Sequence, residues 1–306
     1  MLDLIIIGAG PAGLAASIYA SRFNLNHLVI GLQFGGTIVL AHKVDNYPGL
    51  PGLTGQQLAK KFLDHAEKLG GKIIAQEVME IAKQNHTFSV ITTKGEKYES
   101  KALIVATGTE RKKLDIPGEK ELIGKGVSYC STCDAPFYKD KTVVVVGGAN
   151  AACSGAIHLA EFASKIYLVY RKSDLRAEPF WVKEIKKHPK IEVIYKQNLT
   201  KILDVDQGKV TAVELDQKYE GKKSLECQGV FIEIGGVPLT GLVREIGVEI
   251  ESDGHIKTNR EMETNIKGVY CVGDINSTFR EFKQVVSAVA EGAIAAQGVY
   301  QSLNKK

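Results

Sequence analysis

The residues best suited to chemistry in this 306-residue chain are two cysteines separated by two residues, in the segment Cys130-Ser131-Thr132-Cys133-Asp134. Such a pair can hold a metal ion, can close a structural disulfide, or can pass electrons by cycling between a dithiol and a disulfide. An acid follows the second cysteine, so a proton donor lies beside the pair in the sequence. The surroundings of the pair decide between these alternatives.

The other cysteines and the composition help to decide between a metal site, a structural disulfide and a redox pair. Three of the five cysteines, Cys153, Cys227 and Cys271, are isolated, which is typical of a reducing compartment where a structural disulfide framework would not persist. A hydrophobic share of 44% and a charged share of 24% are ordinary for a globular protein, and 306 residues are enough for two separate cores. The formal net charge of +4 is spread along the chain, so we expect no nucleic-acid partner.

The sequence lacks the patterns of a secretory signal and of a membrane span. Asp3 and the strand-like run Leu4–Ile7 stand where a signal would have a basic leader and an apolar stretch. The longest uncharged stretch, Thr142–Ala160, is interrupted by two glycines and an asparagine, which favours a strand, a turn and a helix. We therefore expect a cytoplasmic protein without a membrane segment.

The start of the chain predicts a dinucleotide-binding turn. The apolar strand Leu4–Ile7 enters Gly8-Ala9-Gly10-Pro11-Ala12-Gly13, and a helical pattern of small residues follows. In such a turn the first glycine allows a tight bend, the second lets the backbone approach a pyrophosphate, and the third lets the helix pack closely on the strand. The acid that usually binds the adenosine ribose is missing, since the strand His27–Ile30 is followed by Gly31-Leu32-Gln33.

A second strand, turn and helix begin at Lys141, so the sequence predicts a second nucleotide. Its glycine turn reads Gly147-Gly148-Ala149-Asn150-Ala151-Ala152, and the methyl group of Ala149 would crowd a pyrophosphate. The next strand, Ile166–Tyr170, ends in Arg171 and Lys172, with Arg176 further along. Cations at this place suit a ribose 2′-phosphate, which favours NADP over NAD, although a solvated basic loop is the alternative.

Two later segments return to the first nucleotide. The strand Ala102–Val105 runs into Ala106-Thr107-Gly108-Thr109, and Gly268–Ile275 is a strand ending in Gly273-Asp274. Ligands gather at the carboxyl ends of parallel strands, so Asp274 can reach a hydroxyl of a sugar chain. The helix expected at about Phe282–Leu303 would then point its N-terminus at the ring system.

With these landmarks the chain resembles the low-molecular-weight thioredoxin reductases, class II FAD-dependent pyridine nucleotide-disulfide oxidoreductases, over essentially its whole length. The order of the motifs is as specific as the motifs themselves. The matching stretches are GAGPAGLAA (8–16), DNYPGLPG (45–52), ATGT (106–109), GVSYCSTCDAPFY (126–138), the second glycine turn (147–152), YRKSDLRA (170–177), IGGVPLTGL (234–242), TNREMETNIKGVYCVGDI (258–275) and FKQVVSAVAEG (282–292).

The resemblance implies an α/β fold with two Rossmann-like nucleotide-binding domains, the second inserted in the first. The FAD-binding domain is expected at 1–113 and 239–306, and the NADPH-binding domain with the CxxC pair at 114–238. The expected FAD-binding residues are Gly8, Gly10, Pro11, Ala12, Gly13, Gly35, Gly36, Thr37, Asn46, Ala106, Thr107, Gly108, Gly273, Asp274, Lys283, Gln284 and Val285. The expected NADPH-binding residues are Gly147, Gly148, Asn150, Ala151, Arg171, Lys172 and Arg176.

The resemblance also assigns the cysteines to electron transfer. We expect the pair at the start of a helix, because this geometry lowers a thiol pKa and closes a small, readily exchanged disulfide ring. A structural zinc site needs four ligands, and the remaining cysteines have no partner at ligand spacing, so we expect no metal. By resemblance Cys133 faces the flavin, and Cys130 attacks the disulfide of a thioredoxin or glutaredoxin-like protein. Asp134 can protonate a leaving thiolate, and its alternative role is a helix cap.

The family further implies a homodimer and a partner groove at Lys125 and Phe137, with Pro136 in place of the usual aromatic residue. Because a flavin face cannot hold nicotinamide and a sulfur at once, the inserted domain is expected to rotate about crossings near 110–116 and 235–240.

Departures from the family pattern leave other functions open. Thr37 stands where Gln is usual, Phe282-Lys283-Gln284 replaces Tyr-Arg-Gln, and Tyr170-Arg171-Lys172 replaces His-Arg-Arg. The alternatives are a disulfide reductase fed by ferredoxin or another donor, a ferredoxin or flavodoxin–NADP reductase, and a non-enzymatic redox sensor.

Overall fold

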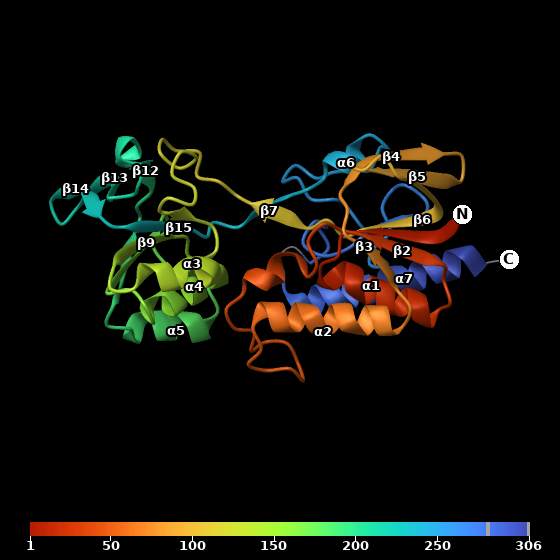
Figure 1. Cartoon of the computed structure of the whole chain (residues 1–306), viewed down its shortest axis with the longest axis horizontal. Helices are drawn as coiled ribbons and strands as arrows, with labels where there is room; N and C mark the ends of the chain where they lie inside the picture. Colours follow the sequence, from red (N-terminus) through yellow and green to blue (C-terminus); the bar gives the residue numbers. More distant parts are fainter. Residues whose placement is uncertain (280–281, 305–306) are drawn as a thin grey trace. The chain divides into compact units, whose positions relative to one another are not determined.

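The chain folds into two compact units, shown in Figure 1. The computed structural model describes residues 1–279 and 282–304. Unit 1 contains residues 1–110 and 237–306, and unit 2 contains residues 111–236. The mixed α/β fold expected from the sequence is confirmed, because each unit has a wholly or mainly parallel sheet with helices packed on it.

Unit 1 is built on a seven-stranded sheet with the order β3-β2-β1-β6-β5-β4, in which β17 pairs with β6. The strands β1, β2, β3, β6 and β17 are parallel, and β4 and β5 form an antiparallel hairpin beside β6. The strand bounds are β1 Leu2–Ile7, β2 His27–Ile30, β3 Lys72–Ile74, β4 Val78–Gln84, β5 Thr87–Thr92, β6 Lys97–Val105 and β17 Val269–Cys271.

Strand β1 is buried on both faces, which explains its continuous apolar run. Leu4 and Ile6 belong to the core shared with helices α1 (Pro11–Arg22) and α7 (Val285–Asn304). Ile5 and Ile7 belong to the core on the other face, together with Phe88 of β5. Figure 1 shows α1, α7 and α2 (Gly55–Lys68) together on one side of the sheet. Short elements complete unit 1: η1 Gly36–Leu40 and α6 Gly241–Arg244.

Unit 2 repeats the parallel arrangement in a five-stranded sheet with the order β11-β10-β9-β15-β8. A separate three-stranded antiparallel sheet, β12-β13-β14, packs into its core. The strand bounds are β8 Val127–Ser128, β9 Thr142–Val146, β10 Lys165–Tyr170, β11 Ile191–Tyr195, β12 Leu199–Ile202, β13 Ala212–Tyr219, β14 Lys222–Glu226 and β15 Gly229–Ile232. The helices are α3 Ser131–Asp134, η2 Ala135–Tyr138, α4 Asn150–Ala160, α5 Pro179–Lys187 and η3 Val205–Gln207.

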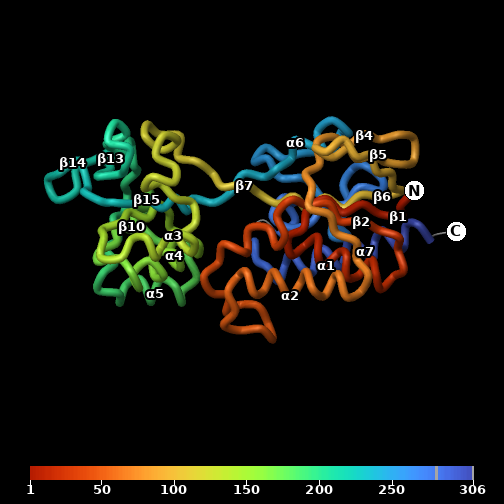
Figure 2. The backbone as a smooth tube through the Cα atoms, in the orientation of Figure 1, coloured from red at the N-terminus to blue at the C-terminus, as the bar shows by residue number. Residues whose placement is uncertain are grey.

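The chain passes between the units twice. Strand β7 (Thr109–Arg111) pairs with β16 (Gly236–Pro238) at these two crossings, which can be followed in Figure 2. Among the described residues no helix has both the length and the apolar character needed to cross a membrane.

Candidate active site

The two cysteines of the CxxC pair form a disulfide at the N-terminus of α3, with their Cα atoms 5.3 Å apart. Cys130 is the N-cap residue, and its Sγ accepts a hydrogen bond of 3.1 Å from the backbone N–H of Cys133. The hydroxyl of Ser128 accepts the backbone N–H of Cys130 at 3.0 Å. Cys130 is half-buried and Cys133 is exposed. The position at a helix start, which was expected from the sequence, is therefore confirmed.

Asp134 is the last residue of α3 and is half-buried. It does not act as a helix cap. Cys130 occupies the cap of α3, and within the described residues the Asp134 side chain accepts no capping hydrogen bond from the following turn, η2. The carboxyl group directly follows Cys133 and has no cap role to fulfil, which leaves it available for proton transfer.

A second carboxylate, which no sequence motif indicates, lies against Ser131 of the CxxC segment. Glu233 follows β15 directly and is only 4% exposed. The hydroxyl of Ser131 donates a hydrogen bond to Oε1 of Glu233 at 3.5 Å. The guanidinium of Arg111 donates to Oε2 at 2.6 Å. Burial raises the pKa of Glu233, and the adjacent positive charge of Arg111 opposes that rise.

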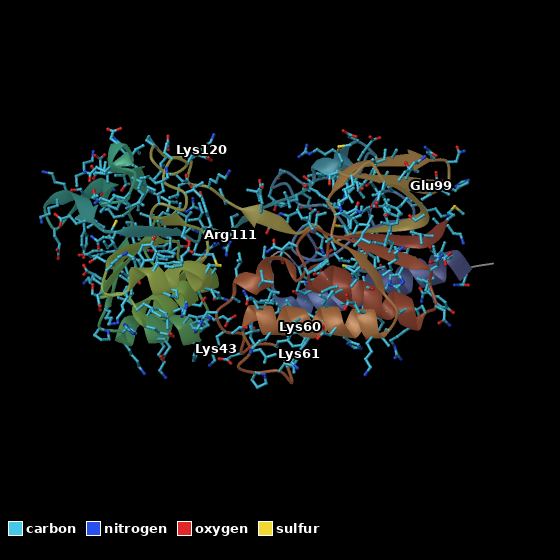
Figure 3. All side chains as sticks on the ribbon, in the orientation of Figure 1. Lys43, Lys60, Lys61, Glu99, Arg111 and Lys120 are labelled. Carbon is cyan, nitrogen blue, oxygen red and sulfur yellow. A yellow bond between two sulfur atoms is a disulfide. The ribbon has the colours of Figure 1, made fainter. Side chains whose placement is uncertain are left out.

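Only one of the two residues of this ion pair stands out in the sequence. Glu233 is the one charged residue in the apolar run Gly229–Ile234. Arg111, labelled in Figure 3, ends β7 in a polar stretch that gave no sign of a buried partner. The two residues are 122 positions apart, so only the fold brings them together.

The first glycine turn has the geometry expected of a dinucleotide site. Gly8 has φ +113°, and a Cβ there would lie 2.2 Å from the backbone carbonyl oxygen of Ala106. A Cβ on Gly13 would lie 1.9 Å from the carbonyl oxygen of Gly8. Among the described residues no side chain caps α1, and its first turn contains no acid. The amides at this helix start can therefore receive an anionic group.

The other segments predicted for FAD surround this turn. Among the described residues a Cβ on Gly10 would have a single neighbour within 4 Å outside its own chain neighbours, the Cα of Gly36 at 3.8 Å, so there is space over the turn. A Cβ on Gly273 would lie 3.2 Å from the Cβ of Ala12. The segments that follow β2, β6 and β17 thus all reach the start of α1, as the strand-end argument predicted.

A long-range hydrogen bond joins two further predicted residues. The amide of Asn46 donates to Oε1 of Gln284 at 2.9 Å, which links segments 238 residues apart. Thr107 donates its hydroxyl to the carbonyl oxygen of Leu239 at 3.1 Å. The remaining predicted residues lie on the same segments: Gly35 before η1, Thr37 in η1, Pro11 at the start of α1, Gly108 after β6, Lys283 two residues before α7, and Val285 at its start.

Asp274 lies at the carboxyl end of β17, half-buried. Burial raises its pKa, while the charges of Lys283 and His255 oppose the rise. Glu291 of α7 accepts the backbone N–H of Gly273 at 2.5 Å and so holds the turn before Asp274. An uncapped helix start, glycines that bring backbones together, and an acid at a strand end together fit a bound dinucleotide.

The second glycine turn shares one feature with the first. Gly147 has φ +142°, and a Cβ there would lie 2.2 Å from the carbonyl oxygen of Glu233. This is the same relation that Gly8 has to Ala106 in unit 1. Helix α4 begins at Asn150, and Ala149, with extended backbone, is its N-cap residue.

The second turn also differs from the first. The ring of Tyr170 packs on it, since a Cβ on Gly148 would lie 2.5 Å from that ring. The side chain of Asn150 donates to Glu178 at 2.9 Å and accepts the Glu178 backbone N–H at 2.7 Å. A carboxylate therefore lies beside the first residue of α4. Its negative charge opposes the binding of an anionic ligand at this helix start.

The predicted cations lie at the expected strand end. Arg171 and Lys172 follow β10 directly and are exposed, as is Arg176. The backbone N–H of Arg176 donates to the carbonyl oxygen of Gly148 at 2.7 Å, which brings the basic segment to the glycine turn. The salt bridges found among the described residues involve none of the three side chains.

Comparison with known proteins gives matches along nearly the whole chain. The sequence model of the family described as pyridine nucleotide-disulphide oxidoreductase matches residues 2–292. A thioredoxin reductase from Bacillus subtilis is 38% identical over 300 residues, which span 97% of this chain and 93% of the relative.

Solved structures give the same picture. The crystal structure of a thioredoxin reductase from Lactococcus lactis matches with a TM-score of 0.93 and 32% identity, covering 98% of each chain. A ferredoxin-flavin thioredoxin reductase from Clostridium acetobutylicum is 36% identical, with a TM-score of 0.54, and the match covers 100% of this chain and 99% of that one.

Proposed function

The chain belongs to the pyridine nucleotide-disulphide oxidoreductase family, and from this membership we propose that it is a thioredoxin reductase. Electrons pass from NADPH through FAD and the Cys130–Cys133 pair to the disulfide of a thioredoxin or glutaredoxin-like protein. The observation that carries the proposal is the Cys130–Cys133 disulfide at a helix start. The near full-length similarity to thioredoxin reductases supports it.

In this proposal the FAD-binding domain is 1–113 with 239–306, and the NADPH-binding domain is 114–238. The turn Gly8–Gly13 and the uncapped start of α1 hold the pyrophosphate of FAD, and Asp274 binds a hydroxyl of its sugar chain. Asn46 and Gln284, joined by a hydrogen bond, hold the segments that flank the flavin. FAD, when bound, supplies the electron pair that reduces the disulfide.

The two sulfurs have different roles. The N–H of Cys133 donates to Sγ of Cys130, and such a bond stabilises a thiolate at this sulfur. Cys130 then attacks the disulfide of the partner protein, and Cys133 displaces the reduced partner from the resulting mixed disulfide. Asp134 donates the proton that a leaving thiolate takes up.

NADPH is the proposed electron donor. Its support is the position of Arg171, Lys172 and Arg176 at the end of β10, where cations suit a 2′-phosphate. The turn formed by Gly147, Gly148, Asn150 and Ala151 receives the pyrophosphate. Rotation of the inserted domain about the paired strands β7 and β16 lets nicotinamide and the dithiol use the same flavin in turn.

We expect the enzyme to be a cytoplasmic homodimer. Its partner protein docks at the exposed residues Lys125 and Phe137.

Specific observations favour a second candidate for the electron donor. The second glycine turn is crowded by Ala149, by the Tyr170 ring against Gly148 and by the carboxylate of Glu178. One similar structure is that of a ferredoxin-flavin thioredoxin reductase. The alternative is therefore the same disulfide reductase fed by a reduced ferredoxin.

A coupled assay tests the function. Purified protein is mixed with NADPH, a thioredoxin and a disulfide dye, and dye reduction is followed for the wild type and Cys130→Ser. We expect turnover by the wild type only, with the bound flavin of the variant still bleached by NADPH. If neither NADPH nor NADH bleaches the flavin while reduced ferredoxin does, the donor is ferredoxin.

A further inference from the structure

A buried ion pair lies directly against Ser131, one of the two residues between the cysteines. Oε1 of Glu233 accepts the hydroxyl of Ser131 at 3.5 Å, and its other oxygen binds Arg111 at 2.6 Å. The side chains of Glu233 and Arg111 are 3% and 28% exposed, so water screens the carboxylate poorly. No step of the proposed reaction uses either residue.

Ser131 is held from two sides. It is 6% exposed, and a Cβ on Gly155 of α4 would lie 2.6 Å from its hydroxyl oxygen. Glu233 lies on the other side, fixed by its position at the end of β15 and by a backbone bond to Val146 of β9. The first turn of α3, which carries both cysteines, is therefore anchored by the Glu233 carboxylate.

The same carboxylate influences the charge of the reduced pair. The amides at the start of a helix stabilise a cysteine thiolate there, and the Glu233 carboxylate binds the side chain of the first residue of α3. A nearby negative charge also opposes thiolate formation, and the positive charge of Arg111 offsets it. The balance of these two charges must affect how readily the disulfide is reduced.

We propose that Glu233 is a positioning residue that anchors the Cys130–Cys133 turn through Ser131 and, as a neutral pair with Arg111, sets the dithiol–disulfide equilibrium. The proposal rests on the disulfide reductase function above, because that function requires the pair to cycle between disulfide and dithiol. Glu233 does not touch the partner disulfide.

Glutathione measures this equilibrium without NADPH or thioredoxin. Two glutathione thiols supply two electrons and two protons, the bond between the Cys130 and Cys133 sulfurs breaks, and glutathione disulfide leaves. The flavin-loaded protein is equilibrated in glutathione buffers at fixed pH, quenched with acid, alkylated and analysed by mass spectrometry. The peptide with both cysteines reports the reduced fraction.

Glu233→Gln keeps an oxygen that can accept the Ser131 hydroxyl but removes the negative charge. Arg111 is then unbalanced and favours the thiolate, so we expect the equilibrium constant for reduction to rise about tenfold, equivalent to about 30 mV. Adding Arg111→Met restores neutrality. The double variant should therefore return to within about twofold of the wild-type constant.

The control is Glu192→Gln, which removes a carboxylate of unit 2 that binds Lys165 and Tyr219 instead of the CxxC turn. We expect it to leave the constant unchanged. An unchanged constant in Glu233→Gln overturns the proposal. The proposal is also overturned if the equilibrium constant of the double variant differs from the wild-type constant at least as much as that of Glu233→Gln does. Such a result is expected if each substitution only damages packing, because two such effects would add instead of cancelling.

The outcomes separate this proposal from the proposed function. If the wild type reduces thioredoxin but Glu233→Gln has a wild-type constant, the function stands and the role of Glu233 is wrong. If the constants shift as expected but the wild type reduces no thioredoxin-like disulfide, the role of Glu233 stands and the function is wrong.

Discussion

Gly292 of α7 packs against the backbone of Ala12 in α1: a Cβ on Gly292 would lie 2.1 Å from the carbonyl oxygen of Ala12. Ala12 belongs to the turn proposed to hold FAD, so the spacing of these two helices fixes the position of that turn.

Gly292→Ala should lower both stability and flavin binding. Alanine favours a helix over glycine by about 1 kcal/mol, but overpacking against backbone costs about 1–3 kcal/mol, and here the clash dominates. Flavin content and the thermal midpoint measure the effect. Gly241→Ala is the control, since a Cβ at this helical glycine meets no atom of the described residues within 4 Å. Equal flavin content and equal thermal midpoints of the two variants would contradict this prediction.

Reaction with a thiol reagent should divide the cysteines into two classes. Burial raises the thiol pKa of Cys153 and of Cys227 to about 12, and that of Cys271 well above its usual value. Such thiols react slowly because the thiolate is the nucleophile. After mild reduction of the folded protein, mass spectrometry should find label at Cys130 and Cys133 only. Rapid labelling of the other three before unfolding would show that they are not buried.

The stability of unit 1 should depend on pH through Glu291. Burial raises the pKa of this carboxyl from 4.5 to about 6. The folded state therefore binds its proton more tightly than the unfolded state, so the stabilisation is complete below pH 4.5 and is lost as pH rises through about 6. The unfolding free energy of the wild type, relative to Glu291→Gln, should fall by about 2 kcal/mol over this interval. Denaturant unfolding at several pH values measures this difference in unfolding free energy. A difference that does not change with pH would contradict the prediction.

Partner recognition should depend on Phe137, which is 71% exposed. Phe137→Ala should raise the KM for thioredoxin about tenfold with kcat nearly unchanged, because an exposed aromatic side chain supplies binding area. Phe180→Ala is a matched control, since Phe180 is another exposed aromatic residue of unit 2, 59% exposed, on α5. A similar rise in both variants would point away from a specific groove at Phe137.

Local patterns were enough to predict the glycine turns, the parallel strands and the placement of Cys130 at a helix start. Each of these depends on residues close in sequence, such as Leu4–Ile7 with Gly8. The sequence also placed Asp274 at a strand end, because carboxyl ends of parallel strands meet at one edge of a sheet.

What the sequence did not reveal depends on distant contacts. The pairing of Arg111 with Glu233, and the Tyr170 ring on Gly148, appear only when strands distant in sequence are brought together. The alternative cap role of Asp134 was wrong because the sulfur of Cys130 accepts the helix amide itself. A sulfur acceptor at the cap position is not part of the usual set of serine, threonine, aspartate and asparagine.

An anaerobic reductive titration of the purified protein, followed by the visible flavin band, tests the central claim most directly. We expect the wild type to contain bound FAD and to accept four electrons per chain, two on the flavin and two on Cys130–Cys133. The Cys130→Ser, Cys133→Ser variant should accept two. A wild type that contains no flavin, or that accepts only two electrons and keeps its disulfide, would contradict the account.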